Sequence, residues 1–239
     1  MFLCYGMHDK CMKKGVFIVL DGLDGSGKGT QTKLLVERLQ REGRDVEMVD
    51  FPQYGTWSGE FVERYLRGEF GSSHEISAHQ ASLFYALDRF SAKKRMQGAL
   101  NQGTILVANR YVSASKGHQL GKLSDDEERK AFLEWLNHTE YSLLGIPVPT
   151  VTLFLHMPPE IGQKLVEKKA PRAYLQGKSK DIHEEDISHL RAAEEGFLFA
   201  AHNDTAETWN VITCTRDGEI RSIEDVHAEI YDTVHKLIS

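Results

Sequence analysis

Four glycines surround a single lysine in the stretch GLDGSGKGT, residues 22–30. The apolar run VFIVLD (16–21) precedes it, and TQTKLLVERLQREG (30–43), which has the spacing of an amphipathic helix, follows. A glycine-rich turn between a strand and a helix lets backbone N–H groups surround an anion, because few side chains stand in the way. The helix adds the positive end of its dipole and Lys28 adds a full charge, so the pattern predicts a phosphate-binding loop.

The loop departs from the common G-x-x-x-x-G-K-[ST] pattern at Gly29, where a hydroxyl residue usually binds Mg²⁺. We therefore expect the loop to bind the phosphates of ATP, with Mg²⁺ held mainly by water and by groups elsewhere, Thr30 being one option. The sequence assigns no other Mg²⁺ ligand. A flexible turn is the alternative, and the flanking strand and helix argue against it. The residues expected around ATP phosphates are Gly22, Asp24, Gly25, Ser26, Gly27, Lys28, Gly29 and Thr30.

Composition narrows the class of protein. The chain has 239 residues, enough for one sizeable α/β domain or for one domain with a mobile insertion. A net charge of −6 argues against a general nucleic-acid or acidic-membrane surface. We find no apolar segment long enough for a signal peptide or a bilayer span, and three cysteines, an odd number, suit a reducing compartment. These features predict a cytoplasmic protein without nucleic-acid or membrane partners.

Strands and helices are predicted to alternate along the chain. The expected strands are 16–21, 45–51, 104–109, 150–157 and 208–215, and the expected helices are 30–43, 58–68, 75–103, 124–145, 159–169, 184–203 and 222–238. The helix at 124–145 should begin with Ser124 as its cap and an acidic first turn. This alternation predicts an α/β fold with a five-stranded parallel sheet and helices on both faces. The polar, basic segment 170–183 lacks apolar periodicity and is a candidate mobile lid.

Aromatic and basic residues near the predicted strand ends suit a second ligand. Tyr85 and Arg89 are four residues apart and would share one helix face, where a ring could stack on a base and a guanidinium could donate to its carbonyl oxygen. Phe51 and Pro52 would form an apolar wall at the edge where open α/β sheets bind ligands. Arg110, after the third strand, could neutralise two phosphates that repel each other. The residues alone also allow a core tyrosine beside a solvated arginine, and an ordinary strand-ending turn.

Five motifs, in this order and spacing, resemble those of thymidylate kinases, which phosphorylate dTMP to dTDP with ATP. They are GSGKGTQ (25–31), FPQY (51–54), YALDR (85–89), NRYVSASKGHQ (109–119) and KDIHEED (180–186). The resemblance covers nearly the whole chain from 16 to 238. It implies a P-loop NTPase fold with a small mobile lid at about 169–183, Mg²⁺ with ATP, a role in dTTP synthesis and a homodimer. Residues 15–239 would form a single P-loop kinase domain after a disordered tail at 1–14, or after an overlong start that precedes Met12.

The resemblance also implies a role for matching residues. Arg89 would contact O4 of thymine, Tyr85 would stack on the ring, and Tyr54 would bind the dTMP phosphate. Asp24 would orient the sugar and the bridging Arg110, although a loop-capping role fits this residue equally well. The full set expected around dTMP is Asp24, Phe51, Pro52, Tyr54, Tyr85, Arg89, Arg110, Tyr111, Ser115, His118, Gln119 and Glu184.

Members of this family differ in where they keep an extra catalytic arginine, in the phosphate loop or in the lid. Gly25 occupies the loop position, so the chain resembles the lid type. Arg172 is then the expected lid arginine, with Lys178 and Lys180 next, although a merely solvated basic loop is the alternative. The expected catalytic set is Lys28, Arg110 and Arg172. Arg216, in the loop at 214–218, is expected to stack on adenine.

Two positions depart from the family pattern. Asn109 stands where aspartate is normal and keeps the hydrogen-bonding shape without the charge, so we expect slower turnover or an altered metal dependence. His118 stands where a tyrosine normally helps to exclude a 2′-hydroxyl, unless it is simply a surface histidine. The alternatives are therefore a kinase for another nucleoside monophosphate such as dUMP or UMP, or a catalytically weakened nucleotide-binding homologue.

Overall fold

The computed structural model describes residues 14–72, 75–166 and 187–239. In that part of the chain the main sheet has five strands, all parallel to their neighbours. The strands are β1 (Phe17–Asp21), β2 (Val46–Asp50), β3 (Ile105–Asn109), β4 (Val151–His156) and β5 (Trp209–Thr213), in the spatial order β2-β3-β1-β4-β5. The predicted five-stranded parallel sheet is therefore confirmed.

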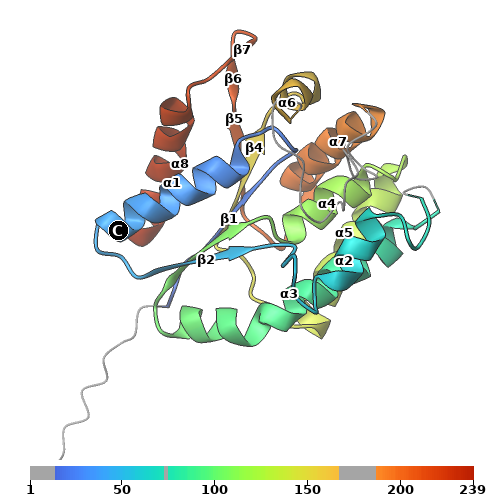
Figure 1. Cartoon of the computed structure of the whole chain (residues 1–239), viewed down its shortest axis with the longest axis horizontal. Helices are drawn as coiled ribbons and strands as arrows, with labels where there is room; N and C mark the ends of the chain where they lie inside the picture. The colour runs from blue at the N-terminus through green and yellow to red at the C-terminus, as the bar shows by residue number, and fades with distance from the viewer. Residues whose placement is uncertain (1–13, 73–74, 167–186) are drawn as a thin grey trace, which may run out of the picture.

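Helices cover both faces of the sheet (Figure 1). Successive side chains of a strand point to opposite faces, so Phe17 of β1 joins one core and Ile18 joins the other. The first core lies under α3 (Ala78–Asn101), α4 (Val112–Leu120), α5 (Asp126–Asn137) and α7 (Ile187–Asn203). The second lies under α1 (Lys28–Arg41), α6 (Pro159–Val166) and α8 (Ile223–Ile238). Burial on both faces explains why VFIVLD is apolar without alternation.

Several elements differ from the sequence prediction. α5 is capped by Asp125, whose carboxylate accepts the N–H groups of Glu127 and Glu128, so the prediction of a Ser124 cap is wrong. A charged cap at that position also complements the helix dipole. The helix continues as a π-helical turn, η1 (His138–Leu143). α4 and the small hairpin of β6 (Thr215–Arg216) and β7 (Glu219–Ile220) were not predicted, whereas α2 (Glu60–Leu66) lies within a predicted helix.

The sheet brings three strand ends to one place. In the parallel register Leu20 of β1 and Asp50 of β2 both pair with Asn109 of β3. The loops that follow these strands therefore leave the sheet side by side at its carboxyl edge, where open α/β sheets bind ligands. Of the helices that the structure describes, none combines the length and the apolar character needed to cross a membrane. Residues 1–13 of the predicted tail at 1–14, and the predicted lid at 169–183, lie outside the described residues.

Candidate active site

A cavity of about 460 Å³ opens at this carboxyl edge, within the usual size range of small-molecule pockets. It is lined by the loop after β1, the ends of β2 and β3, and one side of α3 and α4. The sequence-predicted residues that line it are Asp24, Gly25, Gly27, Lys28, Gly29, Thr30, Phe51, Pro52, Tyr54, Tyr85, Arg89, Arg110, Tyr111, Ser115, His118 and Gln119. One cavity thus joins the phosphate loop to the residues expected around a base.

The phosphate loop depends on glycine at Gly25 and Gly27. Both have left-handed backbone conformations, with φ of 87° and 84°, which residues with a side chain rarely adopt. A Cβ on Gly25 would also lie 2.2 Å from the carbonyl oxygen of Gly162, which lies within α6. The local packing therefore leaves no room for an arginine at residue 25, in agreement with the absence of one from the sequence.

Two cations share one carboxylate oxygen above this loop. Lys28 Nζ donates to Oδ1 of Asp24 at 2.7 Å, and Arg110 Nη2 donates to the same oxygen at 2.6 Å. Lys28 Nζ also donates to the carbonyl oxygen of Leu23 at 3.3 Å. Asp24 thus balances the two positive charges in the free protein, and an incoming phosphate group would compete with it for both.

The lysine of this loop has an unusual pKa. Burial lowers the pKa of Lys28 to about 8, with repulsion from Arg110 acting in the same direction and Asp24 opposing both. At pH 8 about half of these side chains are therefore neutral in the free protein. Phosphate oxygens near Nζ favour the charged form, so a bound nucleotide should raise this pKa.

We expect nucleotide binding at pH 8 to take up about half a proton per site, because binding recharges the neutral fraction of Lys28. Affinity for a non-hydrolysable ATP analogue should correspondingly fall about tenfold between pH 7 and pH 9. Isothermal titration in buffers that differ in ionisation enthalpy measures the uptake. Lys28→Met is the control, and an equal uptake by this variant would contradict the assignment.

Arg89 lies in the wall of the cavity with its side chain 2% exposed, so it is not the solvated arginine that the sequence also allowed. Its Nε and Nη2 atoms donate to the carboxylate of Glu140 in η1, forming a buried ion pair. Nη2 also donates to Ser115 Oγ at 3.0 Å, and Nη1 donates to the carbonyl oxygen of Tyr111 at 3.1 Å. Glu140 was not predicted, because nothing in the sequence around Arg89 marks a partner 51 positions away.

The turn after β2 is fixed by a second missed residue, Asp88. Its carboxylate accepts the backbone N–H of Gln53 at 2.9 Å and the hydroxyl of Ser58 at 2.8 Å. Just before this turn, the buried Phe51 ring packs on Tyr111 with a centroid distance of 5.6 Å. Asp88 lies inside the YALDR motif, directly before Arg89, and that position was the only available signal. Its bonds hold the predicted apolar wall against α3.

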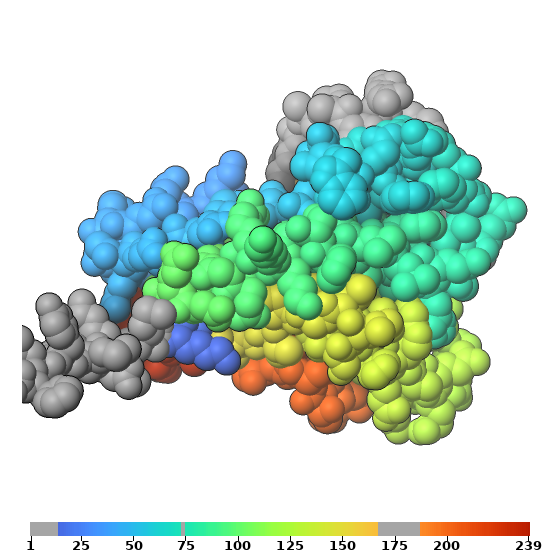
Figure 2. Space-filling model, turned by 90° about the horizontal axis from the view of Figure 1, so that it is seen from below, coloured from blue at the N-terminus to red at the C-terminus, as the bar shows by residue number. Residues whose placement is uncertain are grey.

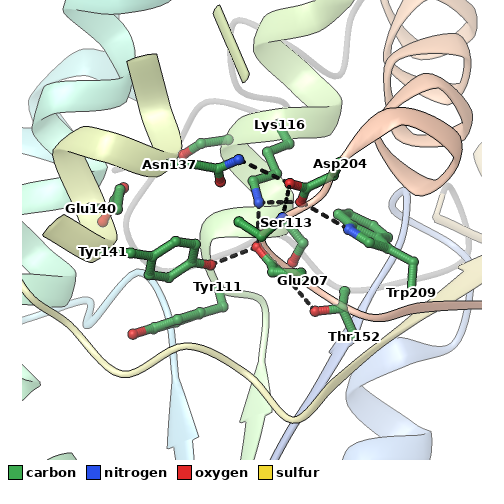
Figure 3. A network of polar contacts seen from close by, with 12 residues as sticks. Tyr111, Ser113, Lys116, Asn137, Glu140, Tyr141, Thr152, Asp204, Glu207 and Trp209 are labelled. Atoms are coloured by element: carbon green, nitrogen blue, oxygen red, sulfur yellow. Dashed lines mark hydrogen bonds and ion pairs between the residues drawn. The ribbon is translucent and has the colours of Figure 1, made fainter. Parts of the chain in front are cut away.

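Figure 3 shows a buried polar network that anchors α4. This helix carries Ser115, His118 and Gln119, which line the cavity. Lys116 Nζ is fully buried and lies 2.5 Å from carboxylate oxygens of both Asp204 and Glu207. The other partners of these carboxylates are the side chains of Asn137, Tyr141, Thr152 and Trp209 and the backbone N–H of Ala206. Buried networks of this kind favour one arrangement of the elements that they join, so α4 presents the same side to the cavity.

His118 is half-buried rather than a surface histidine. Its ring lies 5.8 Å from that of Phe197 and 5.9 Å from that of His189, both on α7. It lines the cavity beside Gln119, whose Oε1 is buried with no hydrogen-bond partner among the described residues. The two side chains therefore present nitrogen and oxygen atoms on the same side of the cavity as Ser115.

Other predicted residues lie elsewhere. Gly22 and Ser26 belong to the loop but do not line the cavity, and Ser26 Oγ would be 2.8 Å from a Cβ on Gly22. Arg216 does not line it either: its side chain is 67% exposed on β6 and lies 3.3 Å from Asp225. The predicted Arg172, Lys178, Lys180 and Glu184 lie outside the described residues. The cavity adds Lys33 and Asp50, which sequence analysis did not select.

Comparison with known proteins gives the family. The family model for thymidylate kinase matches residues 20–230. The chain is 29% identical to the thymidylate kinase of Plasmodium falciparum over 225 residues, covering 94% of this chain and 92% of the relative. It is also 29% identical to that of Halothermothrix orenii over 223 residues, covering 92% and 97%.

A solved structure supports the fold. The thymidylate kinase of Candida albicans superimposes with a TM-score of 0.67 at 20% identity, over 93% of this chain and 92% of the other. At that identity the superposition shows the fold alone, which is the P-loop fold expected from the sequence. Because the family model spans most of the chain, and relatives match it almost from end to end, the protein belongs to the thymidylate kinase family.

Proposed function

We propose that the protein transfers the γ-phosphoryl group of ATP to dTMP, forming dTDP for dTTP synthesis. One observation carries the proposal: a single cavity is lined by Lys28 of the phosphate loop, by Tyr85 and Arg89, and by Arg110. Two nucleotides can meet end to end only where both sites open into one space. Membership of the thymidylate kinase family supports dTMP as the acceptor.

The chemistry requires position and positive charge more than a protein nucleophile. A phosphate oxygen of dTMP attacks the γ-phosphorus in line, and the bond to the β–γ bridging oxygen breaks so that ADP leaves. The negative charge of the attacking oxygen makes a strong general base unnecessary. Lys28 and Arg110 leave Asp24 and take phosphate oxygens in its place, which offsets the repulsion between two anions. Asp24 remains close to both cations and keeps them oriented.

The base is proposed to lie between Phe51 and Tyr85, with Arg89 at its edge. Among the described residues Nη1 of Arg89 donates only to the Tyr111 carbonyl, so its second hydrogen can reach a carbonyl oxygen of thymine. Glu140 and Ser115 hold the guanidinium in that plane. A fixed donor of this kind selects for an acceptor atom at one position of the base.

Mg²⁺ would enter with ATP, and the cavity residues fit it. Mg²⁺ usually retains waters and takes one or two carboxylates together with substrate phosphates. In the described part of the chain no three His, Cys, Asp or Glu residues form a group that could hold a metal ion. The site to test is therefore one in which the protein supplies one or two ligands and the nucleotide phosphates and water supply the rest. Asp50, Thr30 and Asn109 line the cavity, and Oδ1 of Asn109 is a buried acceptor without a described partner. When bound, Mg²⁺ would neutralise charge on the β- and γ-phosphates.

The remaining parts of the proposal concern the lid, the assembly and the compartment. Arg172, supported by Lys178 and Lys180, and Glu184 are proposed from the family resemblance alone. The proposal includes a cytoplasmic homodimer, and exposed apolar side chains on α3 support it: Leu83, Leu87 and Phe90 follow one helix face. This helix lies along the surface shown in Figure 2. Sedimentation equilibrium would test the dimer.

An acceptor panel tests the activity. In a coupled assay with dTMP, dUMP, UMP, dCMP and dGMP, we expect the highest kcat/KM for dTMP. The thymine methyl group alone should favour dTMP over dUMP about tenfold or more, as one methyl group does in an apolar pocket. A preference for UMP would contradict the proposal. Phosphoryl transfer that is undetectable even in a single turnover would indicate a nucleotide-binding protein without catalysis.

A further inference from the structure

Asp50 and Asn109 end neighbouring strands and form a pair. They are directly opposite each other in the parallel register of β2 and β3. Asn109 Nδ2 donates to Oδ1 of Asp50 at 2.9 Å. This bond fixes the orientation of the amide, because turning it over would place two oxygens against each other.

The pair lines the same cavity as Lys28, Thr30 and Lys33. Arg110, Lys28 and Lys33 are close enough to act on the Asp50 carboxylate electrostatically. The surrounding protein raises the pKa of Asp50 by burial, while the Asn109 bond and these cations oppose the rise. Among the described residues Asp50 forms no ion pair, because Lys28 and Arg110 pair with Asp24 instead. The negative charge of Asp50 is therefore available to a cation in the cavity.

The other side-chain atom of Asn109 supplies an independent observation. Its Oδ1 is buried and has no hydrogen-bond partner among the described residues. A buried acceptor without a donor costs about 1–3 kcal/mol, so such an atom usually meets a water or an ion that completes it. A water molecule bound to a cation is a strong donor and would satisfy this oxygen beside the Asp50 carboxylate.

We propose that Asp50 and Asn109 together hold the hydrated divalent cation that accompanies ATP, with Asp50 supplying the charge and Asn109 an oxygen acceptor. The inference rests on the proposed function, because it needs a metal–nucleotide complex in this cavity. The carboxylate of the site is then Asp50 at the end of β2, whereas the family pattern has an aspartate at the end of β3, where this chain has Asn109. The amide at residue 109 then has two functions: it orients Asp50 through Nδ2 and binds a metal-bound water through Oδ1.

The test measures how strongly a metal assists nucleotide binding, without any turnover. The dissociation constant of a non-hydrolysable ATP analogue is measured with EDTA and with Mn²⁺. The value in EDTA divided by the value in Mn²⁺ is the metal coupling, the factor by which the metal strengthens nucleotide binding. Asp50→Asn should lower this ratio about tenfold or more, as loss of an outer-shell carboxylate does at other metal sites, while binding in EDTA persists. The exchange variant Asp50→Asn/Asn109→Asp should recover most of the coupling, because it returns one carboxylate and one amide to the same pair.

Glu47→Gln provides a matched control. Glu47 lies on the same strand, outside the cavity, and pairs with Arg95 at 3.2 Å, so the variant removes the same charge from β2 without touching the site. Unchanged coupling in Asp50→Asn, or an equal loss in Glu47→Gln, would overturn the inference. If the acceptor panel shows no preference for dTMP but Asp50→Asn still lowers the metal coupling, the dTMP assignment is wrong and the metal site stands.

Discussion

Replacement of Arg110 by methionine is expected to lower kcat about 10²–10³-fold, the usual loss when one charged or donor group leaves a transition state. Methionine keeps much of the aliphatic length, so the change removes the guanidinium that reaches both Asp24 and the phosphate end of the cavity. The affinity for each nucleotide alone should fall much less, since Arg110 acts most strongly when two phosphates approach each other. Steady-state kinetics together with separate binding titrations would show this division. A loss confined to dTMP affinity would contradict it.

The backbone at Arg110 allows a second, sharper comparison. Arg110 has a φ of 66°, a left-handed conformation that costs free energy for any residue with a side chain. Arg110→Gly should therefore unfold at higher urea concentration than Arg110→Met, with a free energy of unfolding roughly 0.5–1 kcal/mol larger, although both lose activity. Equal stabilities would mean that the turn carries no strain. If Arg110→Gly is inactive but more stable than Arg110→Met, the left-handed conformation at residue 110 lowers the stability of the protein while the arginine serves its activity.

The sheet and the phosphate loop could be predicted from the sequence because their signals are local. An apolar run, a glycine turn and an amphipathic helix follow one another within residues 16–43, and each is recognisable by itself. The side-by-side arrangement of Phe51 and Arg110 followed from parallel strands that end at one edge. Contacts between distant segments were beyond reach. Nothing in the sequence near Gly25 or Gly162 indicates that the two backbones come into contact.

α4 shows why a helix in the site itself escaped prediction. Its sequence, VSASKGHQL, contains two serines and a glycine and lacks an apolar stripe, so local preference gives no helix. The helix forms because it packs closely on α7: a Cβ on Gly117 would lie 2.2 Å from the Phe197 ring, and a Cβ on Gly196 would lie 2.2 Å from the Gly117 carbonyl oxygen. The same packing buries Lys116 of α4 completely, beside Asp204 and Glu207. Tertiary packing decided both outcomes.

The buried pair of Arg89 and Glu140 leads to the second large effect. Arg89→Met should lower the free energy of unfolding by about 3–5 kcal/mol, because it leaves the carboxylate of Glu140 buried without a counter-charge. Glu140→Leu should lower the free energy of unfolding by a similar amount, because it leaves the guanidinium of Arg89 buried without a counter-charge. The double variant Arg89→Met/Glu140→Leu removes both charges together, and its stability should lie much closer to that of the parent protein. Urea denaturation of the four proteins gives the coupling between the two residues.

The double variant also separates folding from recognition. If Arg89 donates to the base, a folded Arg89→Met/Glu140→Leu protein should still bind dTMP about 10- to 100-fold more weakly, the effect of losing a charged hydrogen bond. Its affinity for an ATP analogue should persist, because Lys28 and the phosphate loop are untouched. Arg64→Met, which breaks an exposed pair with Glu60, should change neither stability nor binding appreciably. Normal dTMP affinity in the double variant would show instead that Arg89 only supports the cavity wall, and that base recognition rests on other residues.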